Sequence, residues 1–77
     1  MSIKEQVIAI LKEVKPTKDL SDVTDIIEAG YLDSFELMSL IAQLAEVFAI
    51  DIDVDEIVPE NFNSLDAMAA MVERLKK

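Results

Sequence analysis

The fold of this chain is decided by residues 30–38, Gly-Tyr-Leu-Asp-Ser-Phe-Glu-Leu-Met. Gly30 is the only glycine among the 77 residues, and it lies at the end of a long polar connection. Glycine adopts a positive φ at little steric cost, which suits a turn. Asp33 and Glu36 have the spacing of a capping box, in which each side chain accepts a hydrogen bond from the other's backbone amide. The segment therefore predicts a turn followed by the start of a helix.

Ser34 follows the predicted capping residue, and it has two interpretations. A serine before a periodic apolar run is commonly the N-cap of the helix itself. If Asp33 is the cap instead, the Ser34 hydroxyl lies in the first helical turn, near unpaired amides and the positive end of the helix dipole. A phosphate group is favoured at such a position. On these residues alone both interpretations stay open, and the wider pattern of the chain decides between them.

Apolar periodicity predicts three longer helices and one short helix in a single domain, residues 1–77. The predicted helices span residues 3–14, 34–48, 59–62 and 65–75. Ser2 and Glu5 form the capping-box pattern of the first helix, and Pro16 prevents its continuation. Asn63 or Ser64 is expected to cap the last helix. The expected fold class is all-α, a four-helix bundle with a long loop, residues 15–33, between the first two longer helices.

Two connections carry further patterns. The loop over residues 15–33 is expected to contain a helical turn within residues 22–28 and to pack its apolar side chains on the bundle: Leu20, Val23, Ile26 and Ile27. Residues 49–56 alternate apolar and acidic side chains, as strands do. A single strand would have no partner, so we expect an extended connector with Ile50 and Ile52 turned inward.

The acids of this connector do not fit a calcium-binding EF-hand loop. With Asp51 at the first position, Glu56 would stand where glycine is required and Phe62 where the bidentate glutamate belongs. No metal site is expected, although loose binding of divalent ions to crowded carboxylates remains an alternative.

The predicted second helix has a core face and a milder apolar strip beside it. The core face comprises Leu37, Leu40, Ile41, Leu44 and Phe48, and the strip comprises Phe35, Met38, Ala42 and Ala45. An exposed apolar strip edged by acids suits docking into a basic groove of a partner protein. We expect Phe35 and Met38 to contact partners because they lie nearest Ser34. Ala42 and Ala45 fit either the edge of the core or the docking surface.

The charge distribution limits the ligands that this chain can bind. It has 16 acids and 7 bases, a net charge of −9, and residues 19–73 contain 14 acids and no base. Proteins bind the many phosphates of nucleic acid or of an anionic membrane through Lys and Arg, so neither is an expected partner. Basic protein patches are favoured, although a solvated acidic face is the plainer interpretation. No apolar run is long enough to span a bilayer, and we expect a cytoplasmic protein.

The composition also excludes most catalytic chemistry. The chain has no histidine and no cysteine, which excludes His- or Cys-based dyads and metal sites built on those residues. One glycine is too few for a glycine-rich phosphate loop. A chain of this size is too small to enclose a substrate pocket of usual volume. We therefore expect a module on which other proteins act and not an enzyme.

Leu32–Phe35, followed by the periodic apolar helix in a short acidic chain, resembles the acyl and peptidyl carrier protein family. The hallmark of that family is an Asp-Ser-Leu-like tripeptide that opens the second helix of a small acidic bundle. The resemblance covers nearly the whole chain. It implies a stand-alone carrier protein with 4′-phosphopantetheine esterified to Ser34 and with Asp33 beside it at the cofactor-binding site. A phosphopantetheinyl transferase would attach the arm from coenzyme A with Mg²⁺.

The resemblance also implies the carrier's cargo and partners. The thiol of the arm would hold an acyl or aminoacyl thioester, loaded by a ligase or adenylating enzyme and used by synthases or transferases. The expected partner contacts of this monomer are Phe35, Glu36, Met38, Ala42 and Glu46. Fatty-acid-like, polyketide, nonribosomal peptide and aminoacyl or D-alanyl pathways remain open.

Departures from the fatty-acid carriers favour a specialised carrier. They stand at Phe35, Ser39, Ala45 and Ala49. Two other classes remain as alternatives: an acidic helical interaction module that is never modified, and a small helical protein that responds to Ca²⁺ or Mg²⁺.

Overall fold

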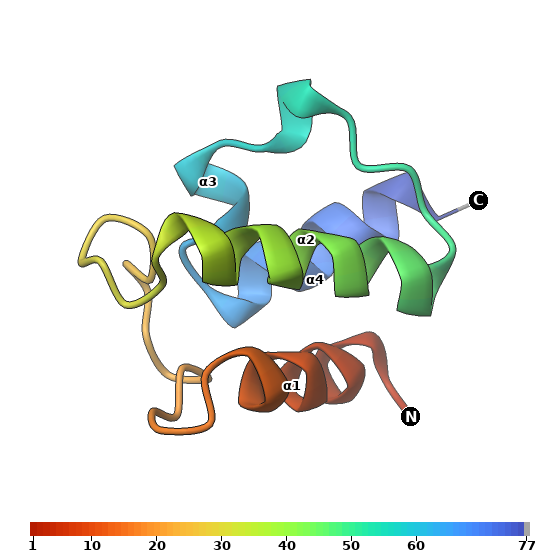
Figure 1. Cartoon of the computed structure of the whole chain (residues 1–77). Coiled ribbons are helices and arrows are strands. Elements are labelled where there is room, and N and C mark those ends of the chain that lie inside the picture. Colours follow the sequence, from red (N-terminus) through yellow and green to blue (C-terminus); the bar gives the residue numbers. More distant parts are fainter. Residues whose placement is uncertain (77) are drawn as a thin grey trace.

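The computed structural model describes residues 1–76 and is built from helices (Figure 1). They are α1 (Ile3–Val14), α2 (Ser34–Phe48), the 3₁₀ turn η1 (Val54–Glu56), α3 (Pro59–Phe62) and α4 (Leu65–Leu75). No strand occurs in the part of the chain that the structure describes. The predicted all-α fold of three longer helices and one short helix is confirmed, and the α-helices have the predicted bounds.

The three longer helices surround one apolar core. α1 packs against both α2 and α4, and α3 packs against α4. Figure 1 shows α1 and α2 running in opposite directions, so that α2 begins at the end of the bundle where α1 stops. Each long helix supplies side chains with no exposed surface, among them Val7, Leu40, Leu44, Met68 and Val72. Full burial of one such side chain contributes about 1.5–3 kcal/mol to folding.

The loop between α1 and α2 is held to the bundle by Leu20 and Ile26, which are both buried. The helical turn expected within residues 22–28 lies later in the chain, as a single turn over residues 25–29 in which the Ala29 amide donates to the Asp25 carbonyl at 2.7 Å. The Tyr31 amide donates to the Ile26 carbonyl at 3.0 Å, and the Gly30 amide donates to the Ile27 carbonyl at 3.1 Å. Gly30 has a φ of 77°. This arrangement is the Schellman motif, which requires a left-handed residue and explains the single glycine.

The connector after α2 begins with a left-handed residue that is not glycine. Ala49 has a φ of 53° and ψ of 46°, and its amide donates to the Ala45 carbonyl. Ile50 is buried and Ile52 is half-buried, as the extended connector predicted. The connector is not extended throughout, because the Asp53 side chain caps the η1 turn through a 2.7 Å hydrogen bond from the Val54 amide.

Candidate functional site

The N-terminus of α2 is closed by Asp33. Its Oδ1 accepts a hydrogen bond from the Glu36 amide at 2.7 Å, and the Glu36 Oε1 accepts one from the Asp33 amide at 3.0 Å. Asp33 has the extended backbone of an N-cap, with φ −81° and ψ 176°. The predicted capping box is therefore present, and Ser34 is the first residue inside the helix and not its cap.

Ser34 is exposed on the surface of the molecule. Among residues 1–76, no hydrogen bond involves its hydroxyl or the backbone amides of Ser34 and Phe35. These two amides belong to the first turn of α2, where the helix dipole favours negative charge. An exposed hydroxyl beside unpaired amides fits a covalently bound phosphate group.

Asn63 fixes the turn that leads to this site. Its side-chain oxygen accepts hydrogen bonds from the amides of Ile27 at 2.9 Å and Glu28 at 3.2 Å, and its amide group donates to the Glu28 carboxylate at 3.2 Å. The Asn63 backbone oxygen also accepts from the Ile26 amide at 2.9 Å. Asn63 was predicted only as a possible cap of the last helix, a role that Ser64 fills by accepting from the Ala67 amide at 3.0 Å.

Glu36 forms an ion pair that the sequence did not predict. The Lys15 ammonium lies 3.4 Å from both oxygens of the Glu36 carboxylate, and the two side chains are only 28% and 25% exposed. Glu36 was expected to contact partners, and the structure shows its carboxylate already bound within the chain. Glu46, the other acid expected to contact partners, is exposed.

The apolar strip of α2 is largely on the surface. Phe35 is 83% exposed and Met38 is 69% exposed. Ala42 is also exposed, whereas Ala45 is half-buried and belongs to the edge of the core. Val47, on the same helix, is 51% exposed and was not predicted from the sequence.

Beside the start of α2 lies a small apolar pocket of about 70 Å³. Its lining comes from the loop, from α2 and from the segment around α3: Ile27, Leu37, Ile57, Val58, Pro59 and Phe62. Leu37 lies one helical turn beyond Ser34, so this pocket is close to the exposed serine. Ile57 and Val58 are also exposed apolar residues that the sequence did not single out.

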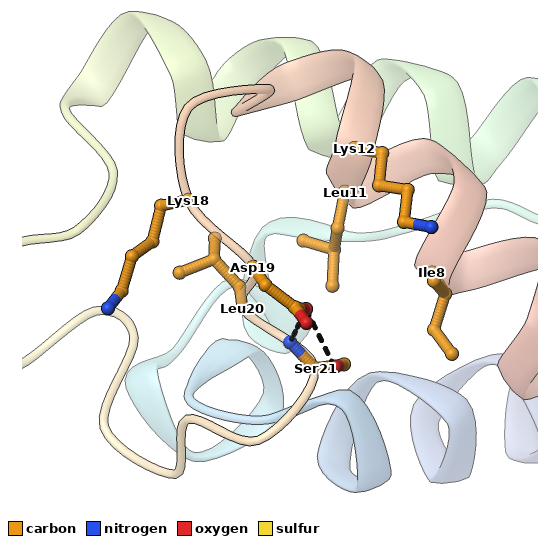
Figure 2. A pocket seen from close by; sticks show the side chains of 7 residues that line it. All are labelled: Ile8, Leu11, Lys12, Lys18, Asp19, Leu20 and Ser21. Carbon is orange, nitrogen blue, oxygen red and sulfur yellow. Dashed lines mark hydrogen bonds between the residues drawn. The ribbon is translucent and has the colours of Figure 1, made fainter.

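A second hollow, at the end of α1, holds no more than about one water molecule (Figure 2). Its volume is about 10 Å³. Asp19 Oδ1 accepts hydrogen bonds from the Ser21 hydroxyl at 2.7 Å and the Ser21 amide at 3.0 Å, as Figure 2 shows. These bonds lower the pKa of Asp19. Asp19 and Ser21 therefore satisfy each other, and a hollow of this volume leaves little room for a ligand.

Within residues 1–76, no group of three or more Asp or Glu side chains is arranged to hold a metal ion. No helix in the described part of the chain is both long and apolar enough to cross a bilayer.

Comparison with known proteins supplies the family. Residues 2–72 match the family described as "Phosphopantetheine attachment site". The chain is 34% identical over 77 residues to the D-alanyl carrier protein of Leuconostoc citreum, with 97% of both chains covered. It is 33% identical over 78 residues to the D-alanyl carrier protein of Streptococcus sanguinis, which covers 99% of this chain and 98% of that protein. For the D-alanyl carrier protein of Lactococcus lactis the identity is 32% over 76 residues, with 96% of both chains covered.

These matches confirm the resemblance to carrier proteins and decide against the alternative of an unmodified interaction module. The exposed serine, the unpaired amides beside it and the bundle that presents them all suit the family's cofactor. The chain therefore belongs to the phosphopantetheine attachment-site family and is a carrier protein with covalently bound 4′-phosphopantetheine.

Proposed function

We propose that Ser34 bears the phosphopantetheine arm and that the arm carries an aminoacyl group, D-alanine in the first place, as a thioester. The observation that carries the assignment of Ser34 is the capping box. Because Asp33 closes the helix, the Ser34 hydroxyl has no partner among the described residues and stands exposed at the positive end of α2.

Attachment of the arm needs one bond at the serine. The Ser34 hydroxyl loses its proton and forms a phosphodiester with the phosphopantetheine part of coenzyme A, while the adenosine bisphosphate part leaves. The two unpaired amides of the first turn of α2 favour the phosphate once it is bound. The reaction is catalysed by a phosphopantetheinyl transferase, which is the first partner of this chain.

Asp33 has a second role beside the serine. Its Oδ1 accepts the Glu36 amide, and no hydrogen bond within residues 1–76 involves its other carboxylate oxygen. Mg²⁺ is bound in proteins through carboxylate oxygens and substrate phosphates. Asp33 is thus placed to contribute an oxygen to the Mg²⁺ that the transferase uses with coenzyme A.

The carrier itself does not catalyse the later steps. It tethers the cargo, so that a docked enzyme meets the thioester at a raised effective concentration. Its further partners are an adenylating ligase that loads the amino acid and a transferase that removes it. Attachment of the arm requires coenzyme A, and loading requires an activated amino acid. We therefore propose that the protein acts in the cytoplasm.

A short cargo suits the dimensions of the site. The apolar pocket beside Ser34 has a volume of about 70 Å³, whereas pockets that enclose a small-molecule ligand measure about 300–1,000 Å³. A long acyl chain would therefore bury little of its surface in this pocket, whereas a small aminoacyl group does not require burial. The three relatives named above are D-alanyl carrier proteins, which supports D-alanine as the first candidate.

The proposed docking surface consists of Phe35, Met38, Ala42 and Glu46, all exposed on α2. It offers apolar contacts close to the arm and a negative charge farther along the helix. A partner that binds it would present an apolar groove with basic residues at its rim.

Mass spectrometry of the intact protein tests the attachment site. Wild type, Ser34→Ala and Ser39→Ala are incubated with coenzyme A, Mg²⁺ and a phosphopantetheinyl transferase of broad specificity. Ser39 is the matched control, because it lies on the same helix and its hydroxyl already accepts from Gln43 at 3.3 Å. We expect one adduct on wild type and Ser39→Ala and none on Ser34→Ala. An adduct on Ser34→Ala, or none on wild type, would contradict the proposal.

Loading of the holo-protein tests the cargo. The arm is offered D-alanine, L-alanine, glycine and a medium-chain fatty acid, each with the matching adenylating ligase and ATP. The mass of the thioester then identifies the preferred group. Faster loading of the fatty acid than of any amino acid would overturn the assignment of an aminoacyl cargo.

A further inference from the structure

An ion pair of Lys15 with Glu36 joins the C-terminal end of α1 to the N-terminus of α2. The two residues lie 21 positions apart in the chain. Figure 1 shows the corresponding ends of the two helices at the same end of the bundle. A cation after the last turn of a helix faces the negative end of the helix dipole, and an acid in the first turn faces the positive end. Both charges are therefore favourable where they stand.

The backbone of Lys15 directs it away from α1. Lys15 is the C-cap, with φ −135° and ψ 76°, and its amide donates to the Leu11 carbonyl at 2.8 Å. Pro16 follows and disfavours the helical region for the residue before it. The position of Lys15 is therefore set by the sequence at the end of α1 and does not depend on the ion pair alone.

Glu36 connects Lys15 to the residue before Ser34. Both Glu36 carboxylate oxygens lie 3.4 Å from the Lys15 ammonium, and Oε1 also accepts from the Asp33 amide at 3.0 Å. The Glu36 amide in turn donates to Asp33 Oδ1 at 2.7 Å. The conformation of Asp33 thus depends on the Glu36 side chain, and the Glu36 side chain is held by Lys15.

We infer that Lys15 is a positioning residue for modification: through Glu36 and Asp33 it keeps the first turn of α2 in the geometry that presents Ser34 to the transferase. The inference rests on the proposed role of Ser34. Both ionic side chains are about three-quarters buried, so the pair is screened less by salt than an exposed one. A distance of 3.4 Å is longer than a strong charge-assisted hydrogen bond, so the pair orients Glu36 and adds little to overall stability.

A different role for Glu36 leads to the opposite prediction. If the Glu36 carboxylate binds a basic residue of the transferase directly, Lys15 competes with that residue. Removal of Lys15 would then strengthen docking and lower KM. A positioning role instead lowers kcat, because the hydroxyl is presented in the wrong geometry while docking is retained.

The test compares Lys15→Met, Lys15→Arg and Lys12→Met with wild type. Methionine keeps the apolar part of the side chain without the charge, and arginine keeps the charge. Lys12→Met is the control. Lys12 is exposed on α1, one turn before Lys15, and its substitution removes the same positive charge. Initial rates of arm attachment give kcat and KM for each variant. Water-exchange NMR gives the exchange rate of the Asp33 amide.

For Lys15→Met we expect kcat to fall and the Asp33 amide to exchange faster, each by about 3- to 10-fold, the range expected for a weakened cap. Lys15→Arg restores most of both quantities, and Lys12→Met leaves them unchanged. The inference is overturned if Lys15→Met behaves like Lys12→Met, or if its main effect is a lower KM. If wild type is modified at another residue, the proposed function fails, while the exchange rate of the Asp33 amide still decides whether Lys15 positions this turn.

Discussion

The side-chain oxygen of Asn63, at the end of α3, accepts a hydrogen bond from the backbone amide of Ile27 at 2.9 Å across 36 residues. The Glu28 amide donates to the same oxygen. One side chain thereby joins the α3–α4 junction to the turn that ends at Gly30, three residues before the cap of α2.

Asn63→Ala should destabilise the protein by about 1–3 kcal/mol, because two loop amides lose their acceptor. The denaturation midpoint in urea should fall with no change of slope. Asn63→Asp keeps the acceptor but places a second carboxylate beside Glu28, so it should retain more stability than alanine at high ionic strength. An unchanged midpoint in Asn63→Ala would show that the turn is held by Ile26 and its neighbours alone.

The helix boundaries could be predicted from sequence because their determinants are local. Ser2 with Glu5, and Asp33 with Glu36, form capping boxes within three residues, and Pro16 ends α1 without regard to the rest of the fold. The exposure of Ser34 followed from the same local logic. The η1 turn was missed because an alternation of apolar and acidic residues does not distinguish an extended segment from a short 3₁₀ turn.

The supports of the site could not be predicted, since they join residues that are distant in sequence. Lys15 meets Glu36 only because α1 and α2 are antiparallel, and Asn63 meets Ile27 only because the loop folds against α3. Neither pair has a spacing that a pattern in the sequence could indicate. The exposure of Val47 depends likewise on how closely α1 covers that part of α2.

Phe35 and Met38 should matter for docking and hardly at all for folding. Phe35→Ser and Met38→Ala should raise the KM of the loading ligase, while their unfolding free energies stay within about 0.5 kcal/mol of wild type because both side chains are exposed. Val47→Ala is the matched control, since Val47 is an exposed apolar residue of the same helix in a groove beside α1. An equal rise of KM in all three variants would mean that docking is not centred near Ser34.

Ala49→Gly should stabilise the protein. Ala49 has a left-handed backbone, which costs a residue with a Cβ about 1–2 kcal/mol. Glycine removes that strain, but it costs about 0.5–1 kcal/mol of folding free energy because its unfolded chain has more conformational entropy to lose. The expected net gain in stability is about 0.5–1 kcal/mol. Thermal unfolding should show a rise in Tm of several degrees. Ala45→Gly, in the last turn of α2, should lower Tm, and a fall in both variants would contradict the strain at Ala49.

The ion pair of Glu56 with Arg74 should make stability depend on pH. A 2.9 Å hydrogen bond from Arg74 holds the pKa of Glu56 below its ordinary value of 4.5. Because the carboxylate is favoured in the folded state, its contribution is complete above pH 4.5 and is lost as the pH falls through the lowered pKa. Glu56→Gln should therefore have a lower urea midpoint than wild type at pH 7, and the difference should shrink below pH 4.5. A difference that persists undiminished in acid would show that the charge of Glu56 is not its source.

Salt should raise the melting temperature of this carrier. Its net charge is −9, and the 14 acids of residues 19–73 have no base among them, so the folded chain repels itself. Raising NaCl from about 0.01 to 0.15 M shortens the screening length from about 30 to 8 Å and should increase Tm. The double variant Asp51→Asn, Asp55→Asn, which removes two exposed charges, should show a smaller increase.

MgCl₂ at the same ionic strength separates screening from ion binding: an equal Tm supports screening, and a higher Tm shows that crowded carboxylates bind the divalent ion. A flat or falling Tm in NaCl would show that self-repulsion does not limit the stability of the bundle.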